Sequence, residues 1–125
     1  RGYFAVTSGL SKDRVEEGIK AILEEVNRLK KELVSKEELE KAKEVLVGNM
    51  YLSLETSDSY ADFYAFQDLM GQKIKTPKEK EASIRKVTSK DVQKIANQIF
   101  KNETLNLAVV GPFEDSKTFK KILSL

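Results

Sequence analysis

Two helix-start signals, each followed by an apolar stripe, constrain the fold of this chain more than any other feature. In "SKEE" (35–38) and in "TPKE" (76–79), a hydroxyl residue stands three positions before a Glu. This is the spacing of a capping box, in which each side chain binds the backbone amide of the other residue. Pro77 strengthens the second signal because its fixed φ suits the first position of a helix. The sequence therefore predicts helices that start at Ser35 and Thr76.

Apolar residues recur at three- and four-residue steps in the other helical segments. Ser11 is a candidate N-cap for a first helix whose stripe consists of Val15, Ile19, Ile22, Leu23, Val26 and Leu29. The helix after Ser35 continues with Leu39, Ala42, Leu46, Met50 and Leu54. The helix after Thr76 has Ile84 and Val87 as its core residues. Thr88 or Ser89 caps the next helix, whose stripe consists of Val92, Ile95, Ala96, Ile99 and Phe100. A last short helix near residues 116–123 has Phe119 and Ile122 pointing inward. Such stripes are typical of amphipathic helices that cover a core.

The stretch "LETSDSYADFYAFQDLMG" (54–71) concentrates two Tyr and two Phe among polar residues. Its "TSDS" (56–59) predicts a kink or a new helix start, because these side chains compete for nearby backbone groups. Phe63, Phe66 and Met70 then share one helical face, and Gly71 is placed to end the helix. We interpret the aromatic residues as core at a corner between helices, in preference to the lining of a ligand pocket.

Two segments are predicted to be strands. "GYFAVTSGL" (2–10) alternates along the chain, and "LNLAVVG" (105–111) is an apolar run rich in β-branched residues. Together with the helices they predict an α+β fold, a helix-rich layer packed on a small β-sheet, with residues 1–125 as a single partial domain. Two strands rarely make a stable sheet by themselves. We therefore expect further strands from the parent chain, from a partner, or from a second copy that pairs with an exposed strand edge.

Composition excludes several classes of function. The 125 residues contain no His and no Cys, which removes the usual general base, the usual zinc ligands and any thiol nucleophile. Lys and Arg total 22 against 20 Asp and Glu, and the two signs alternate, so no nucleic acid is expected as a partner. No apolar run reaches the roughly 20 residues of a membrane span, so no membrane contact is expected. Composition leaves the location of the protein open, with the cytoplasm favoured.

The search for chemistry returns no catalytic, cofactor-binding or metal-binding residue. Ser8, Ser53 and Ser57 have no His to activate them. "VVGP" (109–112) leads into no phosphate-binding motif, and Pro112 lacks the amide that a phosphate cradle needs. We expect the isolated chain neither to hold zinc tightly nor to cleave peptides.

Acidic residues are interpreted as solvated helix surface. Glu37, Glu38 and Glu40 lie at the front of a helix, where they complement the helix dipole. Glu40 with Lys43, like Glu16 and Glu17 with Lys20, has the spacing of an ordinary surface ion pair.

The order of segments resembles the pitrilysin/insulinase family of zinc peptidases, which includes the mitochondrial processing peptidases. The resemblance rests on "GYFAVTSGLSKDRVEEGIKAILEEVNRL", "SKEELEKAKEVLVGNMYLSLETSDS", "IRKVTSKDVQKIANQIF" and "LNLAVVGP", which cover almost the whole chain in order. The short helix after "VVGP", followed by the end of the sequence, favours the later part of the C-terminal, non-catalytic domain. Family members often carry an Arg just after the "LE" segment, where this chain has Tyr60.

The resemblance implies a multi-domain peptidase whose similar domains form a chamber around extended peptides. The family's inverted zinc motif, H-x-x-E-H, cannot match anything here, so zinc is expected in the catalytic domain of the parent protein and not in this chain. The expected function is a non-catalytic chamber wall and domain interface, with the remainder of the parent chain or a paired subunit as partner and a peptide as substrate of the parent. One alternative is a catalytically inactive partner subunit that serves binding or assembly. The other alternative is that the chain is a helical scaffold unrelated to this family.

Overall fold

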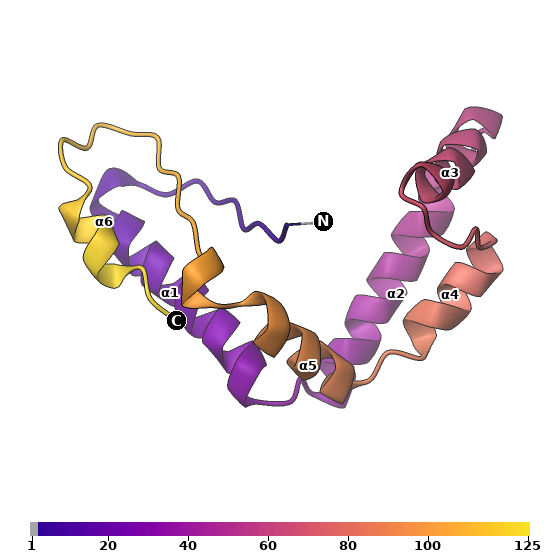
Figure 1. The fold of residues 1–125 in the computed structure, drawn as a ribbon, viewed down its shortest axis with the longest axis horizontal. Coiled ribbons are helices and arrows are strands. Elements are labelled where there is room, and N and C mark those ends of the chain that lie inside the picture. The colour runs from indigo at the N-terminus through magenta and orange to yellow at the C-terminus, as the bar shows by residue number, and fades with distance from the viewer. Residues whose placement is uncertain (1–2) are drawn as a thin grey trace. The chain divides into compact units, whose positions relative to one another are not determined.

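The computed structural model describes residues 3–125, and every regular element among them is a helix (Figure 1). In chain order the elements are the 3-10 helix η1 (Lys12–Arg14), α1 (Val15–Lys31), α2 (Lys36–Ser53), α3 (Ser57–Leu69), α4 (Pro77–Arg85), α5 (Ser89–Ile99), the 3-10 helix η2 (Asn102–Thr104) and α6 (Lys117–Ile122). They form two compact units. The first unit contains the described residues up to Leu33 together with Lys90–Leu125, and the second unit contains Val34–Ser89.

The predicted α+β fold is wrong for the part of the chain that the structure describes. Neither residues 3–10 nor residues 105–111 form a strand, and Gly2, the first residue of the predicted strand, lies outside the described residues. All their apolar side chains except that of Leu105 are exposed, Tyr3 by 95% and Val110 fully. A strand is defined by hydrogen bonds to a neighbouring strand, and alternation in one segment does not supply that neighbour.

The predicted stripe of the first helix forms the core of the first unit. Val15, Ile19 and Leu23 of α1 are buried and in contact with one another. Partly buried side chains from the C-terminal part of the chain pack against them: Leu105, Phe113, Phe119, Ile122 and Leu125. Phe113 and Phe119 meet edge to face with their ring centroids 5.2 Å apart. The prediction that Phe119 and Ile122 point inward from a short last helix is confirmed.

The start of the first unit is held by packing. Ser11 occupies the N-cap position of η1, but its side chain makes no capping hydrogen bond. Leu10 instead lies directly over Gly18, so closely that a Cβ at that position would overlap the Leu10 side chain. Phe4 meets Phe100 edge to face at 5.0 Å. Apolar contacts therefore tie residues 3–10 to the first unit without a strand ladder.

Both predicted N-caps of the second unit form, but of the two reciprocal boxes predicted from the sequence only the one at Thr76 forms among the described residues. The Ser35 hydroxyl accepts a hydrogen bond from the Glu38 amide at 3.1 Å. At Thr76 the box is reciprocal, because the Thr76 amide also donates to the Glu79 carboxylate at 2.8 Å and Pro77 is the first helical residue. The predicted interruption at 56–59 is confirmed as well: α2 ends at Ser53, and Thr56 caps α3 by accepting from the Ser59 amide at 3.2 Å.

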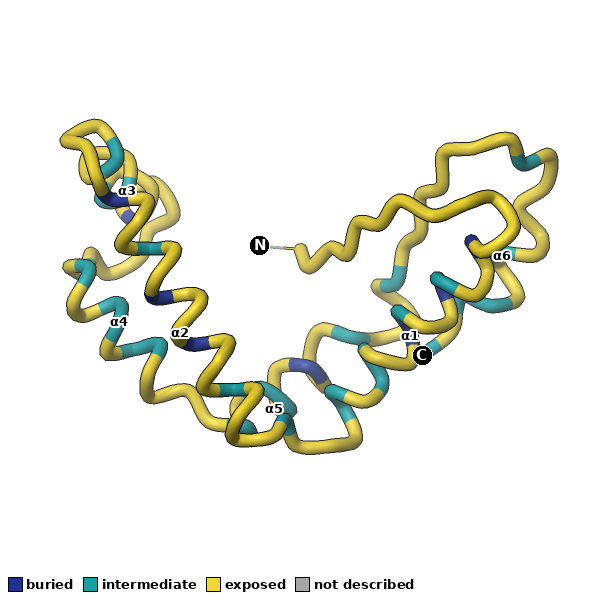
Figure 2. The backbone as a smooth tube through the Cα atoms, turned by 180° about the vertical axis from the view of Figure 1, so that it is seen from behind, coloured by how far each residue is buried: buried dark blue, intermediate teal, exposed yellow. Residues whose placement is uncertain are grey.

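The aromatic corner is only partly a core. Phe63 and Tyr64 are half-buried and meet edge to face with centroids 5.3 Å apart. Phe66, predicted to lie in the core, is 60% exposed, and Met70 is also exposed. Exposed positions cover most of α3 in Figure 2. The correction follows from geometry, since a helix with apolar residues on several sides can bury only the side that faces a neighbour.

Gly71 ends α3 as predicted, in the left-handed conformation with φ of 62°. The Gly71 amide donates to the Asp68 carbonyl at 2.8 Å and the Gln72 amide to the Gln67 carbonyl at 2.9 Å, which is the Schellman arrangement. The buried Gln67 amide then fixes the following loop, because its side-chain oxygen accepts from the Lys75 amide at 3.0 Å and its nitrogen donates to the Lys75 carbonyl at 3.2 Å.

Candidate functional site

A polar network joins α2 to α4 in the second unit, where the two helices run side by side (Figure 1). Arg85 of α4 donates from Nε to Glu81 at 2.7 Å and from Nη1 to Glu44 of α2 at 2.6 Å. The Tyr51 hydroxyl donates to the other oxygen of Glu81 at 2.8 Å. The Arg85 guanidinium thus binds one carboxylate from each helix. The Glu81 carboxylate in turn accepts from Arg85 of its own helix and from Tyr51 of α2.

The hydrogen bonds of the network shift the pKa values of Glu81, Tyr51 and Arg85 in the directions that strengthen those bonds. The hydrogen bond from Arg85, followed by that from Tyr51, lowers the pKa of Glu81 below its usual value. The bond to Glu81 raises the pKa of Tyr51, and the bonds to Glu44 and Glu81 raise that of Arg85. These groups therefore keep their ordinary charges at neutral pH, whereas a general base or acid needs a pKa near the working pH.

Lys43 lies beside this network and is only 6% exposed. Its Nζ donates to Glu40 at 2.8 Å and to the backbone carbonyl of Arg85 at 3.1 Å. The bond from Lys43 is the main cause that lowers the pKa of Glu40. The interpretation of Glu40 and Lys43 as an ordinary surface pair is thus wrong for Lys43, which is part of the contact between α2 and α4.

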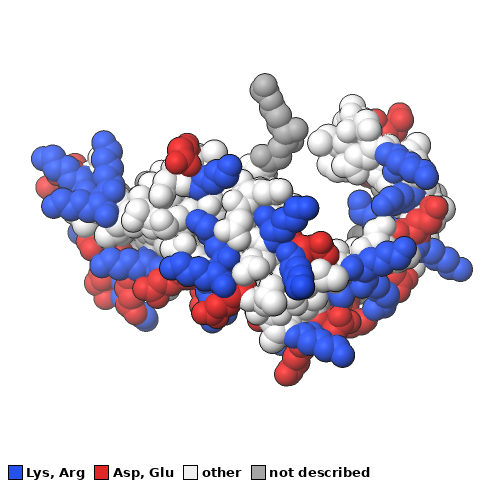
Figure 3. Space-filling model, turned by 60° about the horizontal axis from the view of Figure 1, so that its bottom comes forward, with Lys and Arg blue, Asp and Glu red and all other residues white. Residues whose placement is uncertain are grey.

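The surface ion pairs predicted between Lys20 and the carboxylates of Glu16 and Glu17 do not form among the described residues, and Glu17 has another partner. Glu17 accepts from Arg14 at 3.0 Å, a residue that sequence spacing did not single out. Glu37 and Glu38 are exposed in the first turn of α2, as interpreted from the sequence. Acidic and basic side chains are interspersed on the face shown in Figure 3.

Ser8, Ser53 and Ser57, the serines that have no His to activate them, are all exposed. The Ser53 hydroxyl donates to the Met50 carbonyl at 2.8 Å, a bond within the end of α2, and Ser57 is the first residue of α3. Ser8 lies in the segment before η1. Across residues 3–125, no three potential metal-ligating side chains come together, and no buried side-chain nitrogen or oxygen lacks a partner.

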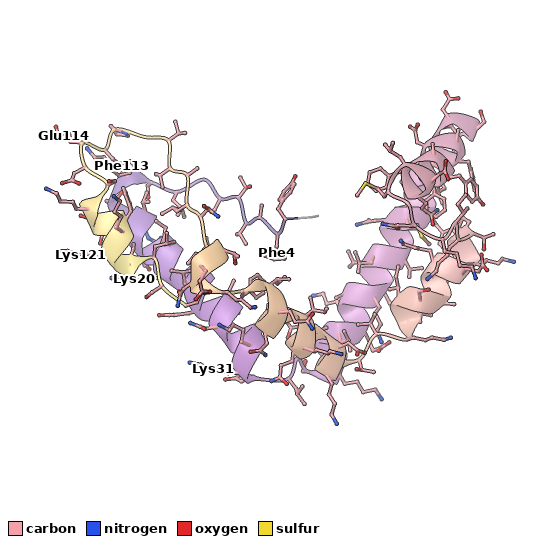
Figure 4. All side chains as sticks on the ribbon, viewed as in Figure 1. Phe4, Lys20, Lys31, Phe113, Glu114 and Lys121 are labelled. Carbon is pink, nitrogen blue, oxygen red and sulfur yellow. The ribbon has the colours of Figure 1, made fainter. Side chains whose placement is uncertain are left out.

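An open groove of about 790 Å³ lies in the first unit, between the start of α1 and the segment that leads into α6. Figure 4 labels Phe113 and Glu114 on that segment and Lys20 on α1. The groove is lined by Lys12, Asp13, Val15, Glu16, Glu17, Lys20, Pro112, Phe113, Glu114, Asp115, Thr118 and Phe119. Its charged groups have both signs, and Phe113 and Phe119 also belong to the core contacts of α1. Ser8, Ser53 and Ser57 are not among the residues that line the groove.

The second unit exposes large apolar side chains, which we call its apolar surface: Val45, Leu46 and Leu52 of α2, and Phe66 and Leu69 of α3. Leu52 is 68% exposed and Leu69 83%. Val45 and Leu52 are seven residues apart and share a face, on the opposite side of α2 from Lys43 and Val47, which are buried. Single exposed apolar residues are normal, whereas apolar patches larger than those of an ordinary monomer mark interaction sites. The five residues lie on two consecutive helices of one unit.

Sequence reasoning missed the network of Tyr51, Glu81 and Arg85. The pair Glu81 and Arg85 has helical i, i+4 spacing, which is a signal that could have been found. The partners on α2 could not, because only the packing of α2 against α4 brings residues 30 to 42 positions apart into contact. No helix in the described part of the chain has the combination of length and apolarity that crossing a membrane requires.

Comparisons with known proteins give a family and two relatives. Residues 1–46 match the family model described as "Peptidase M16 inactive domain". The chain is 28% identical over 123 residues, 98% of its length, to mitochondrial-processing peptidase subunit alpha-2 of Dictyostelium discoideum, and covers 27% of that protein. It is 26% identical over 123 residues to "Probable mitochondrial-processing peptidase subunit beta" of Schizosaccharomyces pombe and covers 26% of it. No solved structure matches at a comparable level.

The chain thus spans about a quarter of the length of the curated relatives it matches, and both relatives are named as subunits. The identities are low, but each alignment covers nearly the whole chain. The family model places the similarity of the first 46 residues in an inactive domain. The resemblance to the pitrilysin/insulinase peptidases predicted from the sequence is therefore confirmed, at low identity, as a similarity to the inactive domain of the M16 peptidase family.

Proposed function

We propose that this chain is a non-catalytic part of a zinc metalloendopeptidase that acts on peptides, where it serves as chamber wall and domain interface. The match of residues 1–46 to an inactive peptidase domain is the observation on which the proposal rests. The composition agrees with it, because a sequence without His or Cys cannot supply the usual ligands of catalytic zinc. Zinc would belong to the catalytic domain of the parent protein.

The apolar surface of the second unit supports the interface role. Leu52, Phe66 and Leu69 expose most of their side chains to solvent, and their removal from water on assembly would be favourable by about 25 cal/mol per Å². The exposed apolar residues Tyr3 and Val110 of the first unit offer further contact area. We propose that the remainder of the parent chain, or a paired subunit, covers these side chains.

The alternative function is that of a catalytically inactive partner subunit in a processing-peptidase-like complex. Its paired-subunit aspect agrees with the names of the two relatives, one an alpha and one a beta subunit of a processing peptidase. The two functions predict different parent genes. An H-x-x-E-H motif encoded in the same open reading frame supports the peptidase, and its absence from the complete frame supports the partner subunit.

The interface role is tested in the full-length parent protein with the double variant Leu52→Glu/Leu69→Glu. We expect loss of assembly in size-exclusion chromatography and a large loss of peptide cleavage by the purified variant, because each substitution places a charge in a dry interface. Gln72→Glu is the matched control, since it adds the same charge at an exposed position of the same unit. Zinc content, measured by elemental analysis, should be equal in all variants.

Thermal unfolding of each variant separates an interface effect from misfolding. If the double variant unfolds, the single variant Leu52→Ser takes its place, because it removes apolar area without adding a charge. Full assembly and cleavage by folded Leu52 and Leu69 variants would contradict the interface role. Stoichiometric zinc in residues 1–125 alone, with cleavage that a chelator abolishes, would contradict the non-catalytic role.

A further inference from the structure

We draw no further inference here: the strongest candidate, the open groove of the first unit between the start of α1 and residues 112–119, carries nothing because charged groups of both signs line it and no buried, unpartnered polar side chain within residues 3–125 points into it.

Discussion

Lys43 Nζ lies 3.1 Å from the backbone carbonyl oxygen of Arg85 and donates a hydrogen bond to it, which ties α2 to the end of α4. The same nitrogen binds Glu40 at 2.8 Å, and the Lys43 side chain is almost fully buried. A cation from one helix thus satisfies a carbonyl at the C-terminus of another, where a positive charge is favoured by the helix dipole.

Replacement of Lys43 by Met should destabilise the second unit. Met fills similar space, but the Arg85 carbonyl loses its donor, and a lost hydrogen bond of this kind costs about 1 kcal/mol. The measurement is urea unfolding of the purified chain, followed by circular dichroism. Lys41→Met, at an exposed position of the same helix, is the matched control and should change the free energy of unfolding by less than about 0.5 kcal/mol. Equal effects of the two substitutions would show that the buried contact adds no stability.

Two glycines with equal space around them should respond in opposite ways to replacement by Ala. A Cβ at Gly48 or at Gly71 would meet no atom within 4 Å, but only Gly71 has a positive φ, of 62°. Gly71→Ala should cost about 1 kcal/mol because Ala is strained in the left-handed region. Gly48→Ala lies inside α2 and should stabilise the chain by about 0.5–1 kcal/mol. Thermal unfolding of both variants under one condition provides the comparison, and a shift of the same sign in both would contradict it.

Phe63 should contribute more to stability than Phe66, although both were predicted to lie in the core. Phe63→Ala at a fully buried position would cost about 3–5 kcal/mol, and the half-burial of Phe63 reduces the expectation to about 1–2 kcal/mol. Phe66→Ala should be nearly neutral for folding, since Phe66 is 60% exposed. Chemical denaturation of the isolated chain distinguishes the two. If Phe66→Ala lowered the free energy of unfolding as much as Phe63→Ala, the difference in burial between the two residues would not decide their contributions, and the prediction would be wrong.

The chain should lose stability in acid, partly through Glu81. Its folded pKa is lowered from 4.5 by Arg85 and Tyr51, so the unfolded state binds the proton more readily. Glu81 therefore stabilises the fold above pH 4.5, and this contribution disappears as the pH falls through the lower folded pKa. Glu40 and Glu79, whose pKa values are lowered by Lys43 and by the Thr76 backbone amide respectively, act in the same direction.

The variant Glu81→Gln tests this pH dependence. It should be less stable than the parent chain at neutral pH and should lose less stability below pH 4.5, because one of the linked carboxylates is gone. Urea midpoints measured at several pH values give the pH dependence of stability for the variant and for the parent chain. Glu37→Gln, at an exposed position in the first turn of α2, serves as the control for loss of a carboxylate. Parallel curves for Glu81→Gln and the parent chain would rule out linkage through Glu81.

Helix starts and ends were predictable because they depend on hydrogen bonds between near neighbours in the sequence. The Ser35 and Thr76 caps, the interruption at 56–59 and the left-handed Gly71 all follow from side chains within a few residues of the bond they make. The stripe of Val15, Ile19 and Leu23 was predictable for a similar reason, since helical periodicity places these residues on one face. The family resemblance likewise needed only the order of segments.

Tertiary structure decided what lies opposite each face, which no local pattern encodes. Residues 3–10 and 105–111 have the composition of strands, but a strand requires partner backbone groups, and the described residues supply none in a ladder. Phe63 and Phe66 were equal in the pattern, yet only Phe63 is half-buried. Lys43 has the spacing of a surface ion pair, and only the approach of α4 buries it against the Arg85 carbonyl. Burial depends on contacts between residues far apart in the chain, so the sequence by itself determined the helices and the packing determined their exposed and buried sides.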